Sequence, residues 1–406
     1  MSEKRSAYKA ILILGIVSLL GDIVYEGSRG LIPDYLRHLG ASALVVGSII
    51  GLGELVSYLS RPISGVIADK FRSYWPLIFL GYGLIASLPM MGMAEMIGGW
   101  FLASALIIVE RLGKGIRTPA RDTVISFVSK SIGSGKAFGL HELLDQVGAV
   151  LGPMTLAAVI GIGYGYLFTF LLLLIPYIAL MFSLYLAKKS LGKYVTHPNN
   201  SSEREENSER HSLKKDVLDL RTVSYITAVV LNTVGLFPVS LMLYQASIVA
   251  EKGYLGIWFV PMLYSFIQLV DAPLALISGL VYDKIGFKVL LVSFTASALV
   301  APLASSGDFV SLLVASIIFG FILGTKESVY RAAITELSPP SIRATTYGFL
   351  NTVTGAASLA AGVIYGYFLD SKVPVIMIAT FAIIIQLAGS IILYYGVLKK
   401  SNNVRT

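Results

Sequence analysis

The stretch Gly65-Val-Ile-Ala-Asp69-Lys70 returns later in the chain, in altered form, as Gly279-Leu-Val-Tyr-Asp283-Lys284. Each copy ends a long apolar run, and the two are 214 positions apart in a chain of 406 residues. A glycine, an acid and a base at one spacing, repeated half a chain apart, indicate an internal duplication. Because both copies follow apolar runs, the pattern predicts a membrane protein built from two related halves.

The composition is that of a protein that crosses a membrane many times. Hydrophobic residues make up 55% of the chain and charged residues only 14%, whereas soluble domains carry about 25% charged residues. No cysteine is present, which excludes disulfides and cysteine nucleophiles. We expect the apolar run that begins near Tyr8 to be retained as a first span, because no small-residue cleavage pattern follows it.

Twelve apolar runs can be counted, each close to the roughly 20 residues that a bilayer-crossing helix needs. A polar stretch at residues 197–211 separates the sixth run from the seventh and is too poor in apolar residues to bury a core. We therefore expect an all-α membrane protein of twelve transmembrane helices in two pseudo-symmetric six-helix bundles. The predicted parts are an N-terminal bundle (residues 1–190), a cytoplasmic linker (191–220) and a C-terminal bundle (221–406). The runs start near Tyr8, Ser42, Trp75, Gly98, Ala137, Tyr164, Ser224, Leu255, Val289, Phe309, Tyr347 and Pro374.

The basic residues predict the orientation, because Lys and Arg accumulate on the cytoplasmic side of a membrane. With both termini cytoplasmic, 24 of the 32 Lys and Arg residues fall on the inner side. Only Arg37, Lys252 and Lys372 fall in outer loops. The expected location is the plasma membrane, and the net charge of +8 is explained without a nucleic-acid partner.

Two further motifs identify a family. Arg111-Leu-Gly-Lys114-Gly115 lies in the fourth run, and Gly148-Ala-Val-Leu-Gly152-Pro153 lies in the fifth. With the twelve runs and the duplicated loop, they resemble the signature motifs of the major facilitator superfamily over nearly the whole chain. The resemblance implies a secondary transporter that works by alternating access. The motif in the fifth run is associated with antiporters, although Met154 stands where that motif usually continues with glycines.

Three other sequence segments resemble those of a poorly characterised prokaryotic, efflux-type branch of this family. They are Asp22-Ile-Val-Tyr-Glu26, Gly113-Lys-Gly-Ile-Arg117-Thr-Pro-Ala-Arg121-Asp122 and Ala137-Phe-Gly-Leu-His141-Glu-Leu-Leu-Asp145.

The resemblance implies that the duplicated loops are gates, in which an acid meets a helix N-terminus or a base and locks one state. The alternative is a solvated turn. In the fifth run, small residues allow close helix packing and a proline kinks the helix, so we expect a bend there, with tight packing alone as the alternative. The gate residues are Gly65, Asp69, Lys70, Arg72, Gly279, Asp283, Lys284, Lys326 and Glu327, and the bend residues are Gly148, Gly152 and Pro153.

Ionisable side chains within the spans are the candidates for coupling and cargo binding, because charge at membrane depth is costly. With a rise of about 1.5 Å per residue, four acids fall near one central layer, where Arg111 is a possible counter-charge. Carboxylates in a low-dielectric cavity can take up and release protons near neutral pH, whereas static ion pairs are the alternative. Among the tyrosines, Tyr25 and Tyr58 are the candidates to line the cavity. The central acids are Asp22, Glu54, Glu110 and Asp145; Glu26 and Arg29 lie toward the outer mouth, and Lys114 and His141 toward the inner one.

The leading interpretation is a proton-coupled exporter of a small organic compound. Its partners are a small-molecule or ion substrate, protons and the lipid bilayer, and we expect a monomer without a cofactor or a bound metal. Two alternatives stay open. Carboxylates with a histidine suit a divalent metal as cargo, and Arg29, Arg111 and Lys114 suit an organic anion or sugar phosphate. An enzyme is not expected, because no nucleophile triad, phosphate loop or zinc-protease motif occurs.

Replacing Asp69 by alanine is expected to slow transport, because a loop that cannot lock one state shifts the conformational equilibrium. The measurement is the initial transport rate in proteoliposomes. An unchanged rate would show that the loop is a solvated turn.

Overall fold

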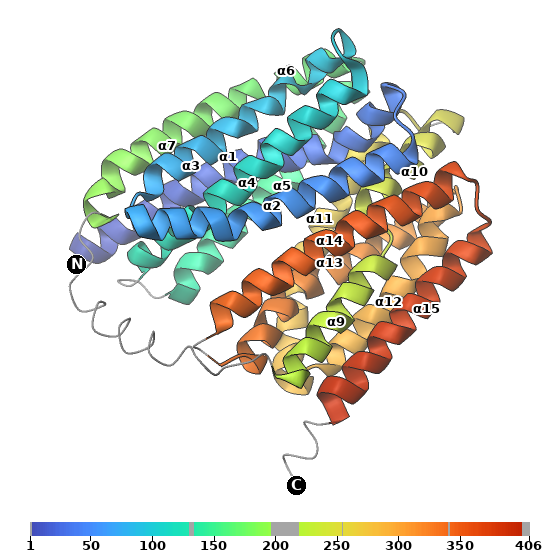
Figure 1. The fold of residues 1–406 in the computed structure, drawn as a ribbon. Helices are drawn as coiled ribbons and strands as arrows, with labels where there is room; N and C mark the ends of the chain where they lie inside the picture. Colours follow the sequence, from blue (N-terminus) through green and yellow to red (C-terminus); the bar gives the residue numbers. More distant parts are fainter. Residues whose placement is uncertain (1, 130–133, 196–218, 254, 340–341, 400–406) are drawn as a thin grey trace. The chain divides into compact units, whose positions relative to one another are not determined.

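The computed structural model describes residues 2–129, 134–195, 219–253, 255–339 and 342–399, and this part of the chain is helical without β-strands (Figure 1). The helices of the first half of the sequence are α1 (Ser2–His38), α2 (Ala43–Phe71), α3 (Tyr74–Gly83), η1 (Leu84–Ser87), η2 (Pro89–Glu95), α4 (Gly99–Ser129), α5 (Ser134–Gly161), α6 (Tyr166–Leu171) and α7 (Leu174–Val195). Those of the second half are α9 (Leu220–Gly235), α10 (Val239–Lys252), α11 (Phe259–Ile285), α12 (Lys288–Ser305), α13 (Phe309–Leu337), α14 (Arg343–Asp370), α15 (Val375–Leu393) and η3 (Tyr394–Leu398).

These helices confirm the predicted all-α fold with twelve spans. In the described part of the chain, eleven helical stretches are long and apolar enough to cross a membrane. The remaining span is α4, which is 31 residues long but carries six charged residues between Glu110 and Asp122. Several spans are interrupted. The seventh, for example, breaks between α9 and α10, where Pro238 is the N-cap of the second helix.

The chain forms two compact units. Unit 1 comprises Met1–Ala41, Val56–Asn199 and Leu255–Ser265, and unit 2 comprises Ser42–Leu55, Asn200–Tyr254 and Phe266–Thr406. Helices α2 and α11 therefore each contribute residues to both units. The division at residues 191–220 stays a prediction, and most of that linker, residues 196–218, lies outside the described residues.

Unit 1 is organised around a very close contact between α1 and α5. A Cβ atom added at Gly148 would lie 2.5 Å from the carbonyl oxygen of Leu19 and 3.0 Å from the Cβ of Asp22. Farther along, Gly152 approaches Gly27, where an added Cβ would lie 3.1 Å from the carbonyl carbon of Gly152. The backbones of these two helices can touch only because glycine, which has no side chain, occupies the contact positions.

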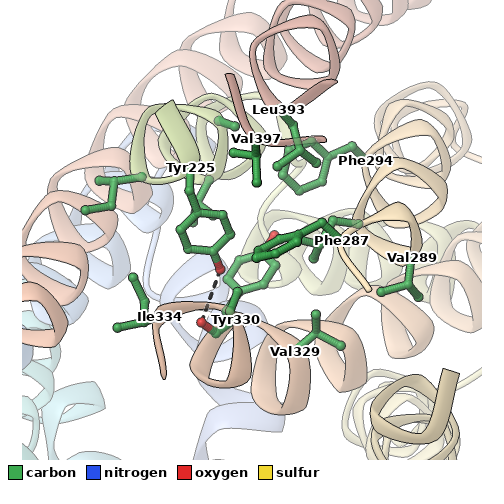
Figure 2. Close-up of a cluster of buried hydrophobic side chains, with 14 of the residues drawn as sticks. Tyr225, Phe287, Val289, Phe294, Val329, Tyr330, Ile334, Leu393 and Val397 are labelled. Atoms are coloured by element: carbon green, nitrogen blue, oxygen red, sulfur yellow. Dashed lines mark hydrogen bonds between the residues drawn. The ribbon is translucent and has the colours of Figure 1, made fainter. Parts of the chain in front are cut away.

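Unit 2 has a hydrophobic core that is rich in aromatic residues (Figure 2). Tyr225, Phe294 and Leu393 are fully buried in it, and the Tyr225 hydroxyl donates a hydrogen bond to the carbonyl oxygen of Tyr330 at 3.1 Å. Next to this core, Asn232 accepts from the Tyr330 hydroxyl at 2.7 Å and donates to Gln386 at 2.8 Å. The buried polar groups of Tyr225 and Asn232 on α9 therefore have hydrogen-bond partners, as buried polar groups require.

The first turns of α2 belong to unit 2, where they pack on α14. The two carboxylate oxygens of Asp370 accept hydrogen bonds from the backbone N–H groups of Ala43 and Leu44, each at 2.9 Å. This carboxylate caps the N-terminus of another helix and complements its dipole. One turn after the cap, a Cβ added at Gly47 would lie 2.2 Å from the carbonyl oxygen of Gly362. The backbones of α2 and α14 are therefore in direct contact at these glycines.

We predict that Gly148→Ala lowers the stability of the protein by about 1–3 kcal/mol, the usual cost of an added methyl group in a packed contact. It should also slow transport, because α1 must shift at Asp22. The measurements are the apparent melting temperature and the initial transport rate.

The matched control is Gly139→Ala on the same helix, because an added Cβ at Gly139 meets nothing within 4 Å. That variant should melt no lower than the parent, since alanine favours a helix over glycine. Equal melting of the two variants would contradict the proposed importance of the α1–α5 contact.

Candidate functional site

The acids predicted on α1 lie on one face of that helix, and each has charged or polar neighbours. Asp22 is half-buried beside Gly148 of α5. Glu26 is only 8% exposed, and one of its carboxylate oxygens lies 3.7 Å from Nη1 of Arg29. The other oxygen accepts a hydrogen bond of 2.6 Å from the hydroxyl of Tyr264 in α11.

Three cations converge on one phenol, that of Tyr25. Its oxygen accepts hydrogen bonds from Arg111, from Lys114 at 2.7 Å and from Arg29 at 3.3 Å. The same three cations lie 4.0–5.8 Å from the centre of the Tyr25 ring, within the range of cation–π attraction. The structure therefore brings together the three residues that the sequence offered for an anion site.

Glu110 partly balances this positive charge. Its Oε2 atom lies 3.4 Å from Nε of Arg111, and both side chains are at least 96% buried. Around Tyr25, Arg29 is thus paired with Glu26 and Arg111 with Glu110, while Lys114 donates its hydrogen bond to the Tyr25 hydroxyl.

A second polar cluster joins α1, α4 and α5. Nε2 of His141 lies 3.4 Å from the Ser18 hydroxyl and 3.9 Å from a carboxylate oxygen of Asp145. Arg121 donates to the same hydroxyl at 3.3 Å and to Asp122 at 3.0 Å. His141 and Asp145, one helical turn apart, are therefore brought together as their spacing predicts.

Asp22 links the two clusters electrostatically. It interacts with the like charge of Asp145 on α5 and with the opposite charges of Lys114 and Arg117 on α4. A proton on either acid removes the repulsion between them and leaves the α4 cations with less opposing charge. The electrostatic state of this region therefore depends on whether Asp22 holds a proton.

Glu54 belongs to unit 2, whereas Asp22, Glu110 and Asp145 belong to unit 1. The single central layer of these four acids therefore stays a prediction.

The two copies of the duplicated loop occupy equivalent places in the local structure. Each lies at the C-terminal end of its helix, α2 or α11, with an exposed acid and base. Three residues after the acid, the backbone of each copy adopts a left-handed conformation, with φ of 47° at Arg72 and 59° at Gly286. The acids are Asp69 and Asp283 and the bases are Lys70 and Lys284, while Gly65 and Gly279 lie one turn earlier on the same helices.

The remaining predicted residues are also placed. Lys326 and Glu327 are half-buried on α13 in unit 2. Pro153 lies inside α5, which runs without interruption from Ser134 to Gly161. Gly148 and Gly152 face α1, so their local contact is the tight packing described above. The roles of these residues in gating and bending stay predictions.

Sequence reasoning missed three contributors to the site. Ser18 and Tyr264 are uncharged, so a search for ionisable groups within spans passes over them. The charge of Arg121 fits the excess of Lys and Arg on the inner side, so the sequence does not mark it as a site residue. For Tyr264 the sequence holds no local signal, because its partner Glu26 is 238 positions away.

Among the described residues, no group of three or more His, Asp or Glu side chains is arranged to hold a metal ion.

The family model described as Major Facilitator Superfamily matches residues 12–362. An uncharacterised protein of Mycobacterium tuberculosis strain H37Rv is 31% identical over 382 residues, which cover 93% of this chain and 91% of that relative. The fosmidomycin resistance protein of Escherichia coli strain K12 is 26% identical over 372 residues, which cover 89% of this chain and 87% of that relative.

Solved structures show the same fold. The nucleoside transporter NupG matches with a TM-score of 0.72 over 94% of this chain and 98% of that chain, at 13% identity. The chain therefore belongs to the Major Facilitator Superfamily, and it is a multi-pass membrane transporter of a small molecule rather than an enzyme.

Proposed function

We propose that this transporter exports a small organic compound across the plasma membrane in exchange for protons, as a monomer with both termini in the cytoplasm. The observation that carries the proposal is the set of acids on α1 and α5. Asp22 and Glu26 are buried or half-buried within a span, and Asp22 interacts with Asp145 on the neighbouring helix. Such groups within a membrane span are retained at a cost and usually serve function.

The exchange follows from competition for the same acids. A cargo with a positively charged or hydrogen-bond-donating group would be favoured by ionised Asp22 and Glu26. Protons that bind these acids would then displace it. Alternating access turns that competition into antiport, because protons that bind from the outer side displace the cargo there and are released to the cytoplasm, where cargo binds again.

The family relatives are consistent with an export direction. One relative over 89% of this chain is named as a fosmidomycin resistance protein, and resistance can arise when a compound is removed from the cell. The predicted gates at Asp69 and Asp283 would supply the switch between the two open states, since both lie at equivalent helix ends.

A second candidate function is the transport of an organic anion. The convergence of Arg29, Arg111 and Lys114 on Tyr25 favours it, because clustered guanidinium and ammonium groups bind carboxylates and phosphates. Here protons would help the cargo rather than compete with it. Protonation of Asp22 reduces the negative charge that opposes Lys114, so an anion and a proton would bind together.

We predict that Asp22→Asn abolishes proton-coupled transport, because the amide can no longer exchange a proton. The assay uses proteoliposomes that contain a pH-sensitive dye, to which fosmidomycin, ethidium and methylphosphonate are added one at a time. The matched control is Asp34→Asn on the same helix, where an amide oxygen can still accept the 2.6 Å hydrogen bond from Tyr166. Proton-coupled transport that survives Asp22→Asn would overturn the proposal.

The pH dependence of binding separates the two candidate functions. If the cargo competes with protons, its apparent affinity falls as the pH is lowered. If the cargo is an anion at the Tyr25 cluster, its affinity rises as the pH is lowered, and Lys114→Gln should weaken binding of methylphosphonate but not of ethidium. Binding can be measured by calorimetry on the purified protein at several pH values.

A further inference from the structure

The hydrogen bond between Tyr264 and Glu26 joins α11 to the acids of α1. Tyr264 is only 2% exposed and Glu26 only 8% exposed, so solvent has little access to either partner. Their oxygen atoms are 2.6 Å apart, which is within the range of about 2.5–2.7 Å typical of a hydroxyl that donates to an ionised carboxylate. This geometry suits a hydroxyl that donates to a carboxylate oxygen.

The surroundings hold the Tyr264 ring in place. A Cβ added at Gly30 would lie 3.2 Å from the ring atom Cδ1 of Tyr264 and 3.1 Å from Pro153, so the ring occupies space that a side chain at position 30 would fill. The next residue, Ser265, donates a hydrogen bond of 2.9 Å to the carbonyl oxygen of Val150 in α5. Two adjacent residues of α11 are thus fastened to α1 and α5.

This attachment involves a distinctive part of the chain. From the second half of the sequence, the residues that belong to unit 1 are Leu255–Ser265, and α11 continues from Phe266 as part of unit 2. The Tyr264 bond therefore acts on the segment at which a helix passes from one unit to the other.

We infer that Tyr264 is a positioning residue that makes the hold of α11 on α1 depend on what occupies Glu26. Charged Glu26 accepts the strong hydrogen bond and holds α11. A proton on Glu26 removes the negative charge, and hydrogen bonds to neutral groups are roughly half as strong, so α11 is released more easily. The inference rests on the proposed proton coupling, because it assigns the step by which a bound proton changes the helix arrangement.

Other charged groups act on the same acid, and they are part of the same equilibrium. Around Glu26 and its partner Tyr264 these groups are Asp22, Tyr25 and Arg29 on α1. On α4, Glu110, Arg111 and Lys114 act on Tyr25. Asp22 is acted on by Asp145 of α5 and by Lys114 and Arg117 of α4.

The test follows Trp258, which lies six residues before Tyr264 and packs against α5. A Cβ added at Gly161 would lie 3.2 Å from the Cβ of Trp258, so release of α11 changes the surroundings of this indole. Trp75 and Trp100 are replaced by phenylalanine, so that Trp258 is the only one of the three tryptophans left. Its fluorescence is then recorded against pH in the full-length protein in lipid nanodiscs, without any cargo.

The parent is expected to show a pH-dependent change in Trp258 fluorescence. Tyr264→Phe should lose most of this change and stay near the acidic value at every pH, because the hold no longer depends on Glu26. Glu26→Gln should do the same, and the double variant should add nothing to either single one, as expected for two residues that act through one bond. Circular dichroism and gel filtration verify that each variant is folded.

Tyr166→Phe is the matched control, because it removes a tyrosine–carboxylate hydrogen bond of the same 2.6 Å length, to Asp34 of α1. The Trp258 fluorescence of this variant should change with pH as that of the parent does. A parent without a pH-dependent change, a Tyr264→Phe variant that follows the parent curve, or a Glu26→Gln variant that still titrates would each overturn the inference. Because this readout needs no transport, a failure of proton-coupled export with an intact Trp258 response would overturn the proposed function and leave the role of Tyr264 standing.

Discussion

The contact between α1 and α5 is the constraint on which the rest of the candidate site depends. These helices approach until the backbone at Gly148 and Gly152 meets the backbone between Leu19 and Gly27. At that separation no side chain fits between them, and the acids on either side are brought into each other's electric field. Asp22 and Asp145 interact because of this approach, and Glu26 lies one turn farther along the same face of α1.

The cations of α4 complete the arrangement. Arg111 and Lys114 reach Tyr25, which stands between Asp22 and Glu26 on the sequence but serves as a common acceptor in space. A phenol oxygen is a weak counter-group for three cations, and the full charges that balance them are the nearby carboxylates. A change of charge on any one of these groups therefore alters the interactions of the others.

Much of the fold could be predicted from the sequence, because bilayer thickness fixes the length of a spanning helix and apolar runs of that length are visible. The helix pair His141 and Asp145 could also be predicted, since residues one turn apart share a face. The partnership of Glu26 with Tyr264 could not, because it depends on how two distant helices pack. The same holds for Ser18, because its hydroxyl accepts a hydrogen bond from Arg121 and contacts His141 only in the folded chain.

The position three residues after the acid of each duplicated loop differs between the two halves of the chain. In the second copy it is Gly286, which adopts a left-handed backbone without cost, whereas in the first it is Arg72. An arginine in that conformation gives up about 1–2 kcal/mol relative to an ordinary one. The two loops are therefore similar in backbone shape but unequal in chemistry, because only the first places a cation at this position.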